Sequence, residues 1–297
     1  MSSLFRSFLA LFAVIFGVIL IPQSALASSI QLSYVSYAET KPQTDVPSEV
    51  EEFVLKQKKV HALVHLPTLR VPILMYHYVE YVKDEKDTTR IALNTFPHVL
   101  DLQIQTLKNA GFTFLTNKQL TEYLNGNGVL PEKSVVLTFD DGYRDFYTDA
   151  YPILKKHNAP ATQYVVSGFF NDQNYMTHQQ VLEIAKEELV EIGVHTETHP
   201  WLAEKNKSFL QKEVLESKHK LEKLIDQEIV SFAYPYGSFD VASIDTVKKA
   251  GFTSAVSVIP GIIHNQDTKY FLYRLRPGKR VGDELLNWIK GSTFTAF

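Results

Sequence analysis

Short β-prone runs alternate with segments of helical periodicity along residues 70–258, and this alternation limits the chain to few folds. The β-prone runs include 71–76, 135–139 and 190–194, and helical segments such as 96–110 and 208–225 lie between such runs. Strands that alternate with helices form βα units whose strands pair in parallel. Because so many units follow one another, we predict an α/β fold in which a parallel sheet closes into a barrel. Functional residues of such folds lie in the loops after the C-terminal ends of the strands.

The run Thr-Phe-Asp-Asp-Gly at 138–142 directly follows one of these predicted strands. Two adjacent carboxylates at the end of a buried strand raise each other's pKa, because their charges repel. A metal ion on one of them would relieve the repulsion and leave the other free to act as a base. The alternative interpretation is structural, an Asp-Gly turn or a helix cap.

Two histidines four positions apart, His195 and His199, directly follow the predicted strand at 190–194. Their imidazoles can converge on one metal ion, and with Asp141 they would form a three-ligand site with positions left open for water. The chain has no cysteine, so any metal must be held by His, Asp or Glu. Since the chain has ten histidines, a pair that arose by chance is the alternative.

A third cluster, Tyr-Pro-Tyr-Gly at 234–237, indicates only an aromatic turn by itself. Taken in order, however, the three clusters resemble the motifs of the polysaccharide deacetylase family, carbohydrate esterase family 4, which is defined by the NodB homology domain. Thr-Phe-Asp-Asp-Gly, His-Thr-x-x-His and Pro-Tyr-Gly all match, and the resemblance covers roughly residues 70–285. The opening Pro-Ile-Leu-Met-Tyr-His at 72–77 looks like the branch of exported poly-N-acetylglucosamine deacetylases.

The resemblance implies a distorted (β/α) barrel of about seven parallel strands. It also implies that Asp141, His195 and His199 bind Zn²⁺ or another divalent ion such as Co²⁺ or Ni²⁺. Asp140 would be the general base that takes a proton from the metal-bound water, and the backbone N–H of Tyr236 would stabilise the oxyanion. A metal suits this chemistry, because it polarises a poorly electrophilic amide carbonyl and lowers the pKa of its bound water.

The sequence departs from the family pattern in its third motif and at the fourth motif, and the position of the general acid is open. The family's third motif carries an Arg, which orients the catalytic Asp, two residues before its Pro, and here that position is Ala233. We expect Arg276 to replace it, with Arg274 as the second candidate. The family's fifth motif, Leu-x-His, supplies the general acid that protonates the leaving amine. His264 in Ile-Ile-His has this form and is our first candidate, and His77 is the second. We find no match to the fourth motif.

Residues next to the motifs are expected to contact the polysaccharide substrate. Tyr143 and Arg144 follow the first motif, and Pro235 and Tyr236 belong to the third. Trp201 is either a platform for a sugar ring or a packing residue. We expect the protein to remove N-acetyl groups from N-acetylglucosamine-type units of peptidoglycan, poly-N-acetylglucosamine or a chitin-like polymer. The alternatives are an O-acetyl esterase on a xylan-type polymer and an inactive module that binds wall polysaccharide.

The N-terminus has the layout of a secretory signal. Arg6 precedes an apolar run at 8–21, and Ala-Leu-Ala at 25–27 offers a cleavage site between small residues. We therefore expect a signal peptide at 1–27, a spacer at 28–68 and the catalytic domain at 69–297, in a secreted or cell-envelope protein. A retained membrane anchor in this segment is the alternative. The formal net charge of -3 gives no reason to expect nucleic-acid binding, which calls for a basic patch.

Overall fold

A computed structural model describes residues 46–61 and 67–292 of the chain. The signal peptide predicted at 1–27 lies outside the described residues, as do residues 28–45 of the predicted spacer. None of the helices in the described part of the chain has the length and apolar character needed to span a membrane.

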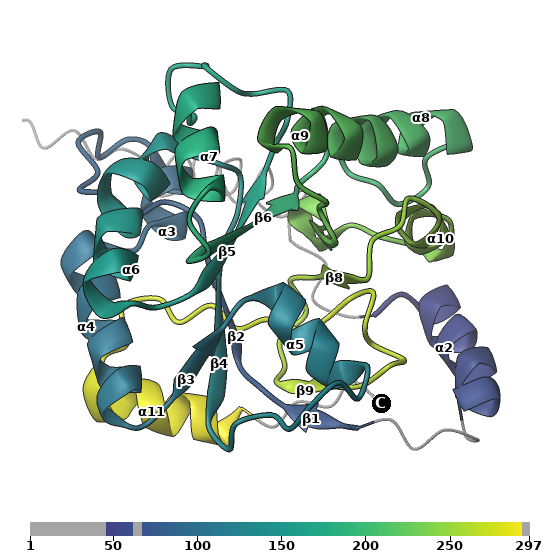
Figure 1. The fold of residues 1–297 in the computed structure, drawn as a ribbon, viewed down its shortest axis with the longest axis horizontal. Coiled ribbons are helices and arrows are strands. Elements are labelled where there is room, and N and C mark those ends of the chain that lie inside the picture. Colours follow the sequence, from purple (N-terminus) through teal and green to yellow (C-terminus); the bar gives the residue numbers. More distant parts are fainter. Residues whose placement is uncertain (1–45, 62–66, 293–297) are drawn as a thin grey trace, which may run out of the picture. The chain divides into compact units, whose positions relative to one another are not determined.

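Seven parallel strands form the central sheet, which confirms the predicted α/β class and strand number (Figure 1). Six of them lie side by side in the order β2 (Ile73–Tyr76), β4 (Ser134–Phe139), β5 (Ala161–Val165), β6 (Val190–Val194), β7 (Ser231–Ala233) and β8 (Ser254–Val256). The seventh, β3 (Thr113–Leu115), pairs with the first half of β4. Every residue of β4 is buried, because both faces of a parallel sheet are covered, and this explains its continuous apolar run.

An irregular segment after β8 bridges the two edges of the sheet. Leu272 pairs in parallel with Val256 of β8, and Leu275 pairs in parallel with Leu74 of β2. The backbone N–H of Leu275 donates a 2.8 Å hydrogen bond to the carbonyl of Ile73, so the segment occupies the place of a further strand. The sheet is therefore a barrel closed by non-repetitive chain, in agreement with the distorted barrel predicted above.

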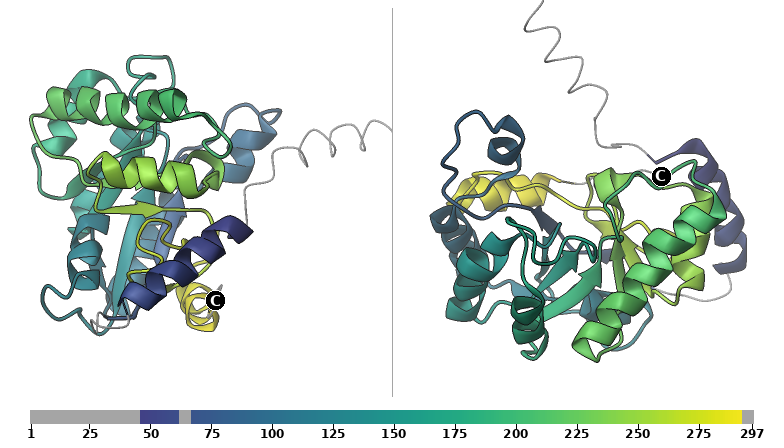
Figure 2. Two further views of the ribbon diagram at one scale, coloured as in Figure 1. Left: turned by 90° about the vertical axis from the view of Figure 1, so that its right-hand side faces the viewer. Right: turned by 90° about the horizontal axis from the view of Figure 1, so that it is seen from above.

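Helices surround the strands, as the view from above in Figure 2 shows. Three of them, α5 (Asn117–Leu124), α7 (His178–Ala185) and α10 (Val241–Lys249), begin with capping boxes, in which the side chain at the N-cap and the side chain three residues later each accept a hydrogen bond from the other's backbone N–H. The helices of the barrel are α3 (Thr88–Leu93), α4 (Pro97–Asn109), α5 (Asn117–Leu124), α6 (Tyr151–His157), α7 (His178–Ala185), α8 (Lys207–Gln211), α9 (Ser217–Ile225), α10 (Val241–Lys249) and α11 (Gly282–Gly291). Two π-turns, η1 (Phe146–Ala150) and η2 (Lys212–Glu216), and a 3₁₀ turn, η3 (Pro235–Gly237), complete the set.

The predicted spacer at 28–68 includes a helix, α2 (Ser48–His61), that contacts α10. Val50 and Val54 of this helix are buried and belong to the main hydrophobic core of the domain. Two short strands, β1 (Leu69–Arg70) and β9 (Ile263–His264), pair antiparallel beside the N-terminal end of β2. The described part of the predicted spacer therefore packs against the barrel through α2.

Candidate active site

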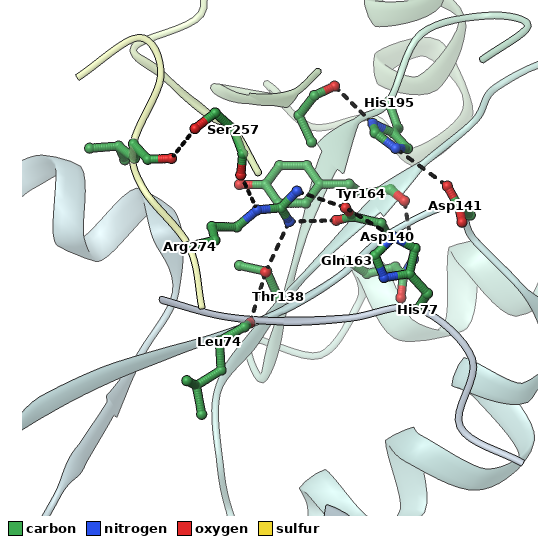
Figure 3. A network of polar contacts seen from close by, with 12 residues as sticks. Leu74, His77, Thr138, Asp140, Asp141, Gln163, Tyr164, His195, Ser257 and Arg274 are labelled. Carbon is green, nitrogen blue, oxygen red and sulfur yellow. Dashed lines mark hydrogen bonds and ion pairs between the residues drawn. The ribbon is translucent and has the colours of Figure 1, made fainter. Parts of the chain in front are cut away.

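Residues that follow the C-terminal ends of four strands meet at one end of the barrel. His77 follows β2, Asp140 and Asp141 follow β4, His195 follows β6, and Tyr236 lies in η3 after β7. Figure 3 shows His77, Asp140, Asp141 and His195 in one network of polar contacts. The carboxyl ends of parallel strands share one end of a barrel, so the loops after them can combine residues that are distant in the sequence.

Asp141, His195 and His199 place their possible ligand atoms within 4.8 Å of one another. The Oδ1 atom of Asp141 lies 3.3 Å from Nε2 of His195 and 3.1 Å from Nε2 of His199. On the far side of its ring, His195 has Nδ1 2.8 Å from the carbonyl oxygen of Ala233, a position where this nitrogen donates its proton. In a neutral His195, Nε2 therefore presents a lone pair toward Asp141.

These three side chains fit a divalent cation. Oδ1 of Asp141 is buried and has no hydrogen-bond partner among the described residues, although unpaired buried carboxylate oxygens are costly. A cation placed among Oδ1 of Asp141 and the Nε2 atoms of the two histidines would satisfy all three atoms when both rings are neutral. Two histidines and one carboxylate are also a usual ligand set for catalytic zinc, with coordination positions left open.

The backbone around these ligands is held in an unusual conformation. Asp141, Thr196 and His199 have φ values of 74°, 68° and 57°, in the left-handed region that non-glycine residues seldom adopt. Each such residue costs about 1–3 kcal/mol, and strain of this kind is concentrated at functional sites. Gly142 continues the turn at a φ of 81°, and a Cβ there would lie 3.1 Å from a methyl group of Val165. The Asp-Asp-Gly turn is thus tightly constrained.

Asp140 is paired with Arg274 rather than with a metal ligand. Two guanidinium nitrogens of Arg274 each donate a 2.7 Å hydrogen bond to a different oxygen of Asp140. Nε of Arg274 donates to the carbonyl of Ser257 at 2.7 Å, which fixes the plane of the guanidinium (Figure 3). Burial opposes ionisation of Asp140, but the charge and hydrogen bonds of Arg274 outweigh it and lower the pKa of the carboxyl.

This pairing corrects the sequence analysis, which placed Arg276 first and Arg274 second in this role. Arg274 is only 1% exposed and lies in the segment that closes the barrel between β8 and β2, beside the end of β4. Arg276 is exposed, and it acts on the site through its charge, which lowers the pKa of His77.

The two histidines proposed as general acid lie at opposite ends of the barrel, and the first choice is wrong in its position. His264 belongs to β9, and its Nε2 contacts the carbonyl of Val71, which precedes β2. His77 follows β2, with Nε2 3.9 Å from Oδ2 of Asp140. Burial lowers the pKa of His77 to about 4, so its ring is neutral at pH 7.

Glu213, which lies within the helical segment predicted at 208–225, supports the loop between the two histidine ligands. Its Oε2 accepts hydrogen bonds from the backbone N–H groups of Glu197 (3.1 Å) and Thr198 (2.8 Å). Its Oε1 accepts one from the hydroxyl of Thr198 at 2.8 Å, and the residue is only 2% exposed. Glu213 lies in the π-turn η2, and π-turns often occur at functional sites. A π-turn contains one residue more than a regular helical turn, and helical periodicity in the sequence does not reveal it.

The four residues predicted to contact substrate have different surroundings. Tyr143 stacks on Tyr78 with ring centroids 3.8 Å apart. Arg144 donates to the carbonyls of Asp172 and Tyr175, both at 3.1 Å, and so holds that loop. Pro235 is buried, whereas Tyr236 is 40% exposed and its ring meets that of His199 edge to face at 4.5 Å.

Comparison with known proteins agrees with this geometry. The family model described as polysaccharide deacetylase matches residues 127–255, which include Asp140 and His195. A Bacillus subtilis protein whose name assigns it to the polysaccharide deacetylases is 29% identical over 230 residues, 77% of this chain and 76% of the relative. A Staphylococcus aureus poly-beta-1,6-N-acetyl-D-glucosamine N-deacetylase is 27% identical over 235 residues, 74% of this chain and 80% of the relative.

Solved structures show the same fold. The Streptococcus pyogenes deacetylase PplD, in complex with acetate, is 29% identical with a TM-score of 0.69, and the match covers 77% of this chain and 100% of PplD. A de-N-acetylase from Aggregatibacter actinomycetemcomitans is 25% identical with a TM-score of 0.65, over 75% of this chain and 100% of that one.

Proposed function

We propose that this chain is a polysaccharide deacetylase, a metal-dependent enzyme that removes N-acetyl groups from a polymer of N-acetylglucosamine-type units. One observation carries the proposal. The possible ligand atoms of Asp141, His195 and His199 lie within 4.8 Å of one another next to Asp140, a carboxylate whose ionised form is stabilised by Arg274. The proposed cation site and the proposed base thus lie side by side.

Zn²⁺ is the ion we propose, with Co²⁺ or Ni²⁺ as substitutes, held by Asp141, His195 and His199. When bound, such an ion supplies a Lewis acid that polarises the acetyl carbonyl and makes water more acidic. The remaining roles belong to the chain's own residues. Asp140 accepts the proton of the attacking water, since both its oxygens are oriented by Arg274 and its charge persists at neutral pH.

His77 is the residue we propose to protonate the leaving amine. Its neutral ring cannot donate a proton to the amine in the resting enzyme, so it must first receive the proton that Asp140 removes from water. The 3.9 Å between Nε2 of His77 and Oδ2 of Asp140 needs only a small movement for this transfer. The backbone N–H of Tyr236 remains our candidate for the oxyanion, because η3 follows β7 at the same end of the barrel.

The substrate class rests on the named relatives. The Staphylococcus aureus relative acts, by its name, on poly-beta-1,6-N-acetyl-D-glucosamine, and we propose a polymer of this kind as the substrate here. We also propose that the enzyme is exported, because residues 1–27 have the layout of a secretory signal. A membrane association through that segment would leave the proposed chemistry unchanged.

The test measures acetate released from poly-N-acetylglucosamine by the full chain, with and without a chelator. We expect release that stops when the metal is removed and returns when Zn²⁺ is added. Asp140→Asn should abolish release but retain the metal, while His195→Ala should lose both. Faster release from O-acetyl xylan than from the N-acetyl polymer would favour the esterase, and bound metal without release from either polymer would favour the binding module.

A further inference from the structure

Trp201 and Tyr236 form an exposed aromatic stack beside the proposed metal ligands. Their ring centroids lie 5.2 Å apart at an interplanar angle of 13°, and the residues are 38% and 40% exposed. Ring faces in contact are separated by about 3.5–4.0 Å, so a centroid distance of 5.2 Å means that the rings are offset. Each ring therefore leaves part of its face open to solvent.

The stack is joined directly to the metal site. The Tyr236 ring meets the His199 ring edge to face, with centroids 4.5 Å apart, and Trp201 follows His199 by two residues. Tyr236 therefore flanks the ligand His199, and Trp201 extends the same aromatic surface.

Hydrogen bonds hold the two loops that carry these rings in a fixed relation. The backbone N–H of Ala203 donates to the hydroxyl of Ser238 at 3.1 Å, and that of Glu204 donates to a carboxylate oxygen of Asp240 at 2.7 Å. Ser238 and Asp240 are both buried, and Asp240 is also the N-cap of α10. A surface that is fixed before a ligand arrives loses little conformational entropy on binding.

The backbone of Tyr236 is constrained as well. Its φ of 59° lies in the left-handed region, and Gly237 follows with a φ of 67°. A Cβ on Gly237 would lie 2.3 Å from a methyl group of Val258, so only glycine fits there. The turn thus holds the Tyr236 ring outward against a local energetic cost.

We infer that Trp201 and Tyr236 form a sugar-binding subsite for the pyranose ring next to the N-acetyl unit that is hydrolysed. Pyranose rings present a face of C–H groups, which buries apolar area when it packs on an aromatic ring. The acetylated unit itself must lie over the ligands, so the surface beyond Tyr236 is left to its neighbour in the polymer. This inference rests on the proposed function, and it predicts a preference for oligomers over single sugars.

The chain has two tryptophans, which allows a direct test of contact. In the full chain, Trp288→Phe leaves Trp201 as the only indole, and Asp140→Asn prevents turnover. Titration with a tetramer of β-1,6-linked N-acetylglucosamine should change the Trp201 emission in a saturable way, and equal concentrations of the monosaccharide should not. Unchanged emission at tetramer concentrations up to those at which the parent enzyme releases acetate overturns the subsite.

Kinetics provide the second test. Trp201→Ala should raise KM for the tetramer about tenfold, equivalent to ~1.4 kcal/mol, and have a much smaller effect on kcat/KM for a single-sugar N-acetyl substrate. Trp201→Phe should retain most of the affinity, because it keeps a ring, and Trp288→Phe serves as the matched control. Equal losses on the tetramer and on the single sugar, or loss of bound metal, would show a structural role and overturn the inference.

The two tests separate this inference from the proposed function. If the parent releases no acetate from any polymer but Trp201 emission responds to the tetramer, the subsite is supported and the proposed activity is wrong. If acetate is released and neither Trp201 emission nor KM responds, the activity stands and the subsite is wrong.

Discussion

The guanidinium of Arg274 forms two hydrogen bonds of 2.7 Å to the carboxylate of Asp140, although 134 positions separate the two residues in the chain. A bidentate pair of this kind fixes both the orientation and the charge of the carboxylate. Both residues are almost fully buried, so neither charge has water to replace a lost partner. Asp140 therefore depends on Arg274 both for its position and for its ionised state.

Replacing Arg274 should harm activity far more than replacing Arg276. Arg274→Lys loses the bidentate geometry, and we expect kcat/KM to fall ~10²-fold or more, since correct placement of a base contributes about 10²–10⁴-fold. Burial then raises the pKa of Asp140, so the acidic limb of the pH–rate profile should move to higher pH. Arg276→Lys is the matched control, and equal losses in the two variants would contradict the assignment.

Bound metal should stabilise the fold. A ligand that binds only the native state adds about 2.7 kcal/mol at a hundredfold excess over Kd, and Zn²⁺ should therefore raise the Tm of the parent. His195→Ala should lose this response, and Asp140→Asn should keep it, because Asp140 is paired with Arg274. Scanning calorimetry with increasing Zn²⁺ measures the effect, and an equal response in all three proteins would argue against the ligand set.

Glu213 should affect metal affinity without touching the metal. Glu213→Gln removes one acceptor oxygen and the charge from a carboxylate that receives three hydrogen bonds from Glu197 and Thr198. We expect the Kd for Zn²⁺ to rise about 10–100-fold, the usual cost when support of a metal ligand is lost. Glu216→Gln, at an exposed position of the same π-turn, is the control and should bind Zn²⁺ like the parent.

His77 and His264 should differ in their effect on catalysis. His77→Gln should lower kcat by about 10²–10⁴-fold and leave the metal content unchanged, because a proton donor is lost next to Asp140. His264→Gln should leave kcat within twofold of the parent, since it lies beside β1. Steady-state kinetics and metal analysis of the two variants decide between the candidates, and a larger kcat loss in His264→Gln would reverse our choice.

His264 should instead make the stability depend on pH. Burial lowers its pKa to about 4, below the value of about 6.5 expected in the unfolded chain. Between these values the unfolded state binds more protons, so the free energy of unfolding falls as pH decreases from about 6.5 to 4. His264→Gln keeps a donor for the Val71 carbonyl and should weaken this dependence in urea unfolding series at several pH values. An identical pH dependence in parent and variant would refute the prediction.

The architecture and the core of the candidate site follow from local patterns in the sequence. Strand and helix periodicity are local properties, and the polar residues after β4 and β6 are placed by the ends of those strands. Asp140, Asp141, His195 and His199 could therefore be named before the fold was known, because each follows a predicted strand and all strand ends meet at one end of the barrel.

The distant residues that complete the site are placed by long-range contacts. Arg274 and Arg276 lie in an irregular segment, and its pairing with β8 and β2 sets which arginine reaches Asp140. His264 lies in β9, which pairs with β1 near the other end of β2, and the two strands are far apart in the chain. Glu213 lies in a π-turn, and its buried carboxylate contacts the loop between His195 and His199. These placements depend on long-range packing, which neither residue spacing nor local propensity encodes.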